Sequence, residues 1–222
     1  MHYKIARIGG DGIGPEVLDE AVRVLEAAQG DGLRFSFESA EVGAALYRRT
    51  GEDLPRETVD LCRAVDAILF GAAGLPDIRH ADGTELTPQI TLRMVLDLYA
   101  GMRPVKLYPG VPSPLRLPAD GRIDYVIFRE NTEGLFASLA ALPRQRPRHR
   151  GKGVANPIAA ILSAALLCRR LGPQHRDPAV TAAADRIDAA VARALIDPRA
   201  HTRDIGGSAS TRACADAVLA AL

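Results

Sequence analysis

Apolar and polar positions follow two periods along the first part of the chain. Short runs with a strand-like pattern occur at residues 3–8, 33–38, 67–70, 103–108 and 123–128. Between them the apolar residues recur at three- and four-residue intervals, the spacing of helices that bury one face. These segments lie at residues 17–28, 41–49, 55–63 and 88–98. Strands that alternate with helices predict an α/β fold with a substantially parallel sheet.

The last third of the chain has a helical pattern only. A strongly apolar run at residues 158–171 is followed by Gly172 and Pro173, which predict the end of a helix. Two more helices are predicted at residues 179–196 and 211–222, the second with Ser210 as its cap.

Composition narrows the class of protein. The 222 residues are 47% hydrophobic and 25% charged, with a net charge of +1, so nothing indicates nucleic acid or an anionic membrane as a partner. Four arginines at 144, 146, 148 and 150 have no interleaved aromatics and are expected to form a solvated loop. Three widely spaced cysteines and the lack of signal-peptide and membrane-span patterns lead us to expect a cytoplasmic protein.

A glycine-rich phrase, GGDGIGPE, follows the first predicted strand at residues 9–16. Its glycines allow a sharp turn and a close approach to a ligand, and Pro15 suits the first turn of a helix. A dinucleotide-binding fingerprint would need its third glycine one position after Gly14. It would also need an acidic residue after the second strand, where only Glu38 is loosely placed. We therefore predict no ordinary Rossmann unit.

Three arginines are the candidate ligand-binding residues. Arg93 lies in a predicted helix, Arg103 begins a predicted strand and Arg129 ends the next one. Their planar guanidinium groups would suit a ligand with two or three carboxylates if they converge. Spacing alone is equally consistent with three solvated side chains, because charged residues are mostly exposed.

Five longer phrases resemble one family, the β-decarboxylating dehydrogenases that act on isopropylmalate, isocitrate, homoisocitrate, tartrate or D-malate. They are GDGIGPE (10–16), LRMVLDLYAGMRP (92–104), FRENTEG (128–134), GKGVANPIAAILSAALL (151–167) and TRDIGGSAST (202–211). The resemblance implies an isopropylmalate dehydrogenase-like three-layer fold with a second, inserted domain. It also implies NAD or NADP bound without a Rossmann unit, and Mg²⁺ or Mn²⁺.

The resemblance also implies roles for individual residues. Arg93, Arg103 and Arg129 would bind the carboxylates of a small di- or tricarboxylate 2-hydroxy acid, and Thr87 and Gln89 would contact its variable group. A larger set of residues would bind the cofactor. Residues 74–84 would line the nicotinamide side, and the GKGVANP phrase would contact the adenosine. The cofactor-binding residues implied are Gly74, Thr84, Gly151, Lys152, Gly153 and Asn156.

The chain departs from the family where the catalytic groups belong. The family's metal-binding aspartates and its lysine lie between the FRENTEG and GKGVANP phrases, yet residues 135–150 contain no Asp, Glu or Lys. The family tyrosine is matched by Phe136, which has no proton to donate, and neither Lys106 nor Lys152 is expected to replace the lysine. Three other aspartates are expected to be scattered surface groups: Asp82, Asp97 and Asp124.

These departures predict an internal deletion that removes most of the inserted domain and the family's homodimer contacts. We expect residues 1–134 to form part of the large domain and the first strands of the second. Residues 135–150 would form a seam loop, and residues 151–222 the C-terminal helices. By resemblance the chain is an NAD(P)-dependent 2-hydroxy acid oxidative decarboxylase, and in this shortened form we expect it to be inactive. The alternatives are a non-catalytic remnant that binds a nucleotide or polycarboxylate, and a deletion product without function whose sheet exposes apolar surface.

Overall fold

A parallel sheet forms the centre of the molecule. The computed structural model describes residues 1–113, 115–116, 121–131 and 152–222. Its main sheet has the order β2-β1-β3, and all of its pairings are parallel. The strands are β1 (His2–Ile8), β2 (Arg34–Ala40) and β3 (Ala67–Phe70). The predicted parallel sheet is thus confirmed, and the predicted bounds of β3 are correct to the residue.

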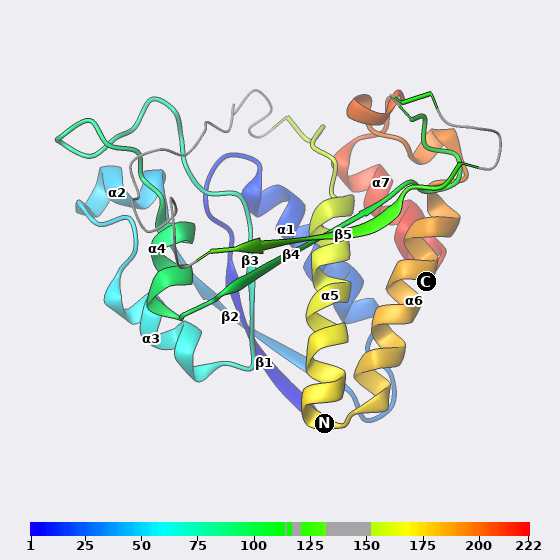
Figure 1. Cartoon of the computed structure of the whole chain (residues 1–222), viewed down its shortest axis with the longest axis horizontal. Helices are drawn as coiled ribbons and strands as arrows, with labels where there is room; N and C mark the ends of the chain where they lie inside the picture. The colour runs from blue at the N-terminus through cyan, green and yellow to red at the C-terminus, as the bar shows by residue number, and fades with distance from the viewer. Residues whose placement is uncertain (114, 117–120, 132–151) are drawn as a thin grey trace.

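Helices cover both faces of this sheet, which confirms the three-layer arrangement (Figure 1). One face is covered by α1 (Gly14–Ala27), α5 (Ile158–His175), α6 (Pro178–Ala194) and α7 (Thr211–Ala220). The other side carries the shorter α2 (Ala44–Thr50), α3 (Arg56–Ala64) and α4 (Pro88–Val95). Two 3₁₀ turns, Pro198–Ala200 and Arg203–Ile205, connect α6 to α7.

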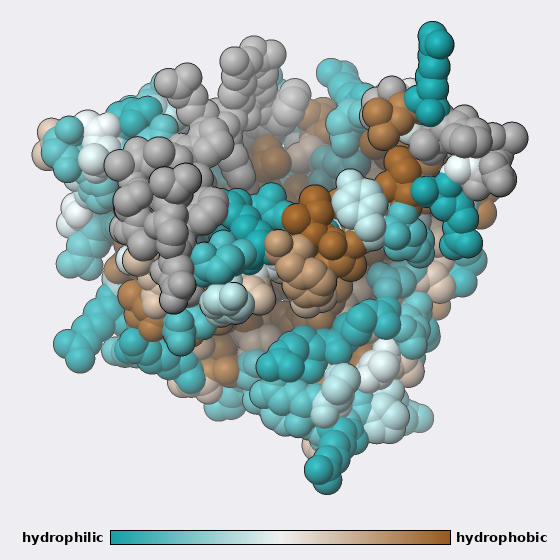
Figure 2. All heavy atoms as spheres, viewed as in Figure 1, coloured by the Kyte–Doolittle hydropathy of each residue, from teal (hydrophilic) through white to brown (hydrophobic). Residues whose placement is uncertain are grey.

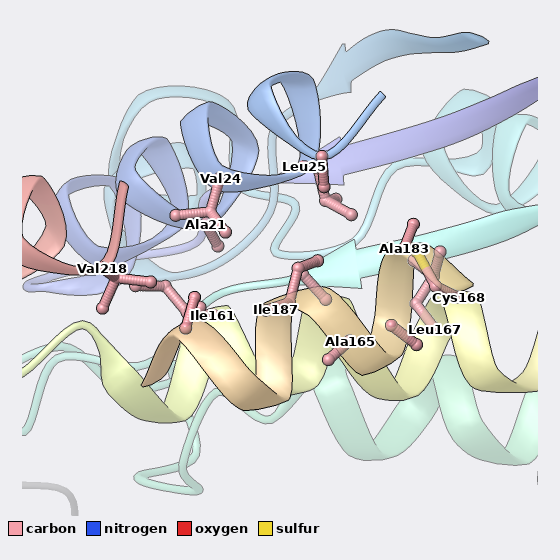
Figure 3. Close-up of a cluster of buried hydrophobic side chains, with 14 of the residues drawn as sticks. Ala21, Val24, Leu25, Ile161, Ala165, Leu167, Cys168, Ala183, Ile187 and Val218 are labelled. Carbon is pink, nitrogen blue, oxygen red and sulfur yellow. The ribbon is translucent and has the colours of Figure 1, made fainter. Parts of the chain in front are cut away.

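The larger core lies between α1 and the C-terminal helices (Figure 3). Val24 on α1, Ile161 on α5, Ile187 on α6 and Val218 on α7 are all fully buried. Burial of side chains of this size contributes about 1.5–3 kcal/mol each, so this contact between the chain's two ends dominates the stability of the fold. Among the described residues, no helix is long and apolar enough to cross a membrane.

Helix α5 corrects the prediction that a helix ends at Leu171, because it continues through Gly172 and Pro173 to His175. A Cβ at Gly172 would lie 2.1 Å from Thr181 Oγ1, so the glycine serves close packing against α6 instead of ending the helix. Helix α4 ends at Val95, three residues before its predicted end, because Asp97 adopts a positive φ of 51°.

A second sheet is an antiparallel ribbon of two strands, β4 (Ala100–Lys106) and β5 (Asp124–Glu130). All residues of both strands are exposed or only half-buried. Arg103 therefore lies in the middle of its strand, not at the beginning as predicted, because pairing with β5 extends β4 back to Ala100. The ribbon exposes several apolar side chains, among them Met102, Val126 and Phe128.

The glycine-rich phrase makes its close approach to the protein's own backbone. A Cβ at Gly14 would lie 2.2 Å from the carbonyl oxygen of Gly9 and 2.5 Å from the carbonyl oxygen of Ala72. Ala72 belongs to the loop that follows β3. The amide of Asp11 donates to the Ala72 carbonyl at 2.6 Å. The glycines are thus explained by contact between two turns at the carboxyl end of the sheet.

A buried carboxylate joins these turns to α2. Asp11 is 4% exposed and accepts hydrogen bonds from the backbone amides of Ala44 (2.7 Å), Ala45 (2.9 Å) and Gly74 (2.8 Å). A Cβ at Gly43 would lie 2.1 Å from the Asp11 carboxylate, so the carboxylate fits only because residue 43 is glycine. Asp11 therefore fixes the position of the loop that begins at Gly74.

We expect Asp11→Ala to lower the free energy of unfolding by about 3 kcal/mol, because one buried and two partly buried backbone amides lose a charged acceptor. Urea denaturation would measure the change. Asp31→Ala, which removes an exposed carboxylate from the turn before β2, is the matched control and should have little effect. An Asp11→Ala protein as stable as the control would contradict the assigned role.

A second prediction concerns Tyr3, whose hydroxyl donates to Asp177 at 2.9 Å and joins β1 to the start of α6. Burial, together with this carboxylate, raises the pKa of Tyr3 to about 12. In the unfolded chain the tyrosine ionises near pH 10, so the unfolded state loses its proton first and stability falls between about pH 10 and 12. Tyr3→Phe should make this fall shallower in urea titrations at several pH values. Tyr125→Phe, at an exposed site, should leave the slope unchanged.

Candidate functional site

The β4–β5 ribbon places two of the three arginines on one face. Arg103 lies opposite Ile127 and Arg129 lies opposite Gly101, so the two arginines are diagonal neighbours with Cα atoms roughly 7–8 Å apart. Gly101 has no side chain, which leaves the same face open beside Arg129. The ladder thus brings together residues that are 26 positions apart in the sequence.

Arg93 completes the cluster from α4. Burial, and then the nearby guanidinium groups of Arg103 and Arg129, lower the pKa of Arg93 from its usual value. The three predicted arginines therefore lie near one another, with Arg93 and Arg129 half-buried and Arg103 exposed. Like charges held together in this way favour an anion between them.

A cavity of about 280 Å³ lies beside Arg93, between the end of β3 and α4. Its wall combines apolar side chains with two polar ones, Arg93 and Gln89. The apolar lining comes from Ile68, Phe70, Leu92 and Leu98. The sequence did not predict these lining residues, because the pattern of one strand does not indicate which of its neighbours leaves a cavity beside it.

Gln89 is the second polar residue of the cavity wall. Its Oε1 atom is buried and has no hydrogen-bond partner among the described residues. A buried acceptor without a donor costs about 1–3 kcal/mol, which a donor on a bound molecule would recover. Thr87 is the residue immediately before α4. Its backbone carbonyl accepts a hydrogen bond from the Ile90 amide at 2.9 Å.

The segment that leads into α5 is held by the last part of the chain. Asn156 donates through Nδ2 to Asp204 at 2.9 Å and accepts from the Ile158 amide at 2.9 Å. The Thr211 amide donates to the Gly153 carbonyl at 2.9 Å. The GKGVANP and TRDIGGSAST phrases are thus neighbours, and Asn156 keeps one N–H and one oxygen lone pair for a ligand.

The other predicted cofactor residues lie apart from one another in the chain's loops. Gly74 begins the loop fixed by Asp11, and Thr84 is exposed and bonded to Asp82 at 2.9 Å (backbone) and 2.7 Å (hydroxyl). Lys152 is exposed and Gly153 has a positive φ of 61° with open space around it. In Figure 1 this segment and the loop after β3 lie at the same end of the molecule, at the carboxyl ends of the strands. Phe136 and Gly151 lie outside the described residues.

The metal that the resemblance implies finds no fitting site in the described part of the chain. There, no three His, Cys, Asp or Glu side chains are grouped to hold an ion. Asp82 is engaged with Thr84, Asp97 follows α4, and Asp124 lies opposite Lys106 on the ribbon. No metal-dependent step can be derived from these residues.

Sequence comparison places the chain among dehydrogenases. A sequence model described as isocitrate/isopropylmalate dehydrogenase matches residues 4–143 and 145–218. The 3-isopropylmalate/3-methylmalate dehydrogenase of Methanocaldococcus jannaschii is 48% identical over 139 residues, which are 63% of this chain and 37% of that protein. The 3-isopropylmalate dehydrogenase of Corynebacterium efficiens is 47% identical over 133 residues, 60% of this chain and 38% of that protein. The matched region thus spans well under half the length of these curated relatives.

Solved structures show the same fold. Isocitrate dehydrogenase from Methylococcus capsulatus superposes with a TM-score of 0.81 at 21% identity, covering 100% of this chain and 99% of that one. A β-decarboxylating dehydrogenase from Thermococcus kodakarensis gives 0.69 at 22% identity, covering 99% and 96%. Together with the family match over nearly all residues, the fold and the arginine cluster lead to one conclusion: the chain belongs to the isocitrate/isopropylmalate dehydrogenase family.

Proposed function

We propose that this chain binds a small di- or tricarboxylate 2-hydroxy acid at the cluster of Arg93, Arg103 and Arg129. We further propose that it derives from an NAD(P)-dependent oxidative decarboxylase and does not turn this ligand over by itself. The observation that carries the proposal is the convergence of three guanidinium groups from α4 and the ribbon beside a cavity. Guanidinium groups bind carboxylates through paired, charge-assisted hydrogen bonds.

The cavity lining favours a ligand that carries a hydroxyl group and apolar carbon atoms in addition to its carboxylates. The buried Gln89 Oε1 atom would accept a hydrogen bond from a ligand hydroxyl, and the apolar lining would contact carbon atoms. The named relatives are dehydrogenases of 3-isopropylmalate, a compound with such a mixture of groups. If NAD or NADP binds, it would contact the backbone of residues 152–153 and Asn156, and it would supply the hydride acceptor.

The absence of turnover is proposed from the residues that the family reaction uses. Residues 135–150 contain no Asp, Glu or Lys, and Phe136 occupies the position of the family tyrosine. When several catalytic groups act as a unit, the loss of one of them lowers the reaction rate by several orders of magnitude. The alternative, a deletion product without function, predicts no binding of any carboxylate.

Binding is tested by calorimetric titration with citrate, isocitrate and 3-isopropylmalate. We expect at least one to bind, and Arg93→Gln to weaken that binding at least tenfold, because a charged hydrogen bond contributes about 1.5–3 kcal/mol. Arg56→Gln, which removes an arginine with 94% of its side chain exposed on α3, should bind like the parent. No binding of any of the three acids to the folded parent would remove the proposal.

Turnover is tested separately by NAD(P)H absorbance. The parent chain, with NAD or NADP and with Mg²⁺ or Mn²⁺, should produce no NAD(P)H from isocitrate, 3-isopropylmalate, tartrate or D-malate. Sustained production with any of them would show that the chain is active and would contradict the proposed loss of catalysis, while leaving the binding site intact.

A third experiment separates a ligand site from a structural ion cluster. Like charges on neighbouring arginines in a watery environment repel by roughly 0.5 kcal/mol. Arg103→Gln should therefore leave the protein as stable as the parent, or more stable by about this amount, while weakening carboxylate binding. Urea denaturation and calorimetry on the same samples give both quantities. A clear loss of stability would mean that Arg103 supports the fold instead of the ligand.

A further inference from the structure

The two faces of the β4–β5 ribbon carry different side chains. Met102, Val126 and Phe128 lie on one face, and Figure 2 shows hydrophobic residues gathered over the middle of the ribbon. Arg103 and Arg129 lie on the other face, which we call the arginine face. Side chains two positions apart on a strand share a face, so the arginine face consists of the odd-numbered residues. A further odd-numbered residue at the same end of the ribbon is therefore a neighbour of the arginines.

Asn131 is such a residue. Its amide donates to the carbonyl of Tyr99 at 2.9 Å, which continues the ladder by one pair beyond the end of β5. Asn131 therefore follows Arg129 on the arginine face. Its side chain lies over Gly101, because a Cβ at Gly101 would be 2.8 Å from Asn131 Nδ2 and 3.4 Å from Asn131 Oδ1. The Asn131 carboxamide thus enters the space that Gly101 leaves beside Arg129.

A backbone carbonyl determines how this carboxamide is oriented. Asn131 Nδ2 donates to the carbonyl oxygen of Leu98 at 3.4 Å. Only the NH₂ end of a carboxamide can donate to a carbonyl, so this contact assigns the nitrogen and the oxygen of the side chain. Within the described part of the chain, no hydrogen bond to Asn131 Oδ1 is formed. Leu98 also lines the cavity, so the carboxamide adjoins both the arginine face and the cavity wall.

The arginine cluster lacks one function that a hydroxy acid needs. Arginine side chains only donate hydrogen bonds, so they recognise carboxylates and offer no acceptor to a hydroxyl hydrogen. A 2-hydroxy acid carries such a hydrogen next to a carboxylate. An acceptor beside the arginines distinguishes this acid from the same acid without its hydroxyl, because the acceptor stays unpaired when the hydroxyl is missing.

We propose that Asn131 determines the specificity of this chain for 2-hydroxy acids, with its Oδ1 atom accepting a hydrogen bond from the 2-hydroxyl. The inference rests on the carboxylate binding proposed above. The site then has two side-chain acceptors, Gln89 in the cavity wall and Asn131 at the ribbon. Asn131 is the acceptor beside the ribbon arginines, so it bonds the hydroxyl that neighbours their carboxylate.

Calorimetric titration with pairs of acids tests this assignment. Citrate and isocitrate are each compared with tricarballylate, and 3-isopropylmalate is compared with 2-isopropylsuccinate. Both analogues keep every carboxylate and lack only the hydroxyl, so the ratio of dissociation constants within a pair measures recognition of the hydroxyl. The parent should bind a hydroxy acid about fivefold or more tightly than its analogue. Asn131→Leu, which is close in volume, should bring this ratio near one.

Gly101→Ala tests the same contact while keeping the carboxamide. The added Cβ would lie 2.8 Å from Asn131 Nδ2, the end of a flexible side chain, whereas the nearest backbone atom is the Arg129 carbonyl oxygen at 3.4 Å. The strand should therefore keep its position and the carboxamide should move, so the ratio should fall as it does in Asn131→Leu. Gln89→Leu removes the other acceptor and should keep the parent ratio. Circular dichroism and urea denaturation show whether each variant keeps the fold.

The possible results separate this inference from the proposed function. A parent that binds a hydroxy acid no more tightly than its analogue overturns the role of Asn131 and leaves the carboxylate site in place. The role is also overturned by a ratio that survives Asn131→Leu or Gly101→Ala, or by a ratio that is lost in Gln89→Leu. A folded parent that binds none of the hydroxy acids removes the carboxylate site and the role of Asn131 together.

Discussion

The approach of two backbone turns at the carboxyl end of the sheet is the constraint on which the rest of the structure depends. The turn after β1 and the loop after β3 touch through backbone atoms, which only glycine at positions such as 14 permits. The Asp11 carboxylate then joins this contact to the amino end of α2 and to Gly74. The loop that begins there leads to α4, so the position of Arg93 follows from this contact. A phrase that looks like a nucleotide-binding motif is, in this fold, a structural joint.

From that joint the chain builds a site from two unlike parts. α4 is packed on the sheet, since Leu92 is buried in the smaller core with Ile8 and Cys62. The ribbon that carries Arg103 and Arg129 is held mainly by its own ladder and by its ends, where Tyr108 packs on the larger core. One wall of the proposed carboxylate site is therefore rigid. The opposite wall is a two-stranded ribbon, a structure that is marginal on its own in water.

Much of the fold could be predicted from the sequence, because apolar periodicity reports burial directly. β3 and the capping of α7 by Ser210, whose hydroxyl accepts from the Ala213 amide at 3.1 Å, agree with prediction. The predicted end of α5 at Leu171 is wrong, because packing of Gly172 against α6 outweighs the usual tendency of Gly172 and Pro173 to end a helix. The sequence is equally consistent with clustered and with separate arginines, because the register that pairs β4 with β5 cannot be read from either strand alone. The hydrogen bonds of Asp11, and the Gln89 oxygen that has no partner in the described part of the chain, depend on residues distant in sequence, which no local pattern reports.

The order in which the core is assembled has a consequence for synthesis of the chain. α1 buries Val24 against Ile161, Ile187 and Val218, which lie on helices near the carboxyl end. At typical rates of about 5–20 residues per second, a ribosome needs on the order of ten seconds or more to pass from α1 to α5. During that interval the apolar face of the first strands and α1 has no native cover. The nascent chain should therefore depend on chaperones more than its modest size suggests.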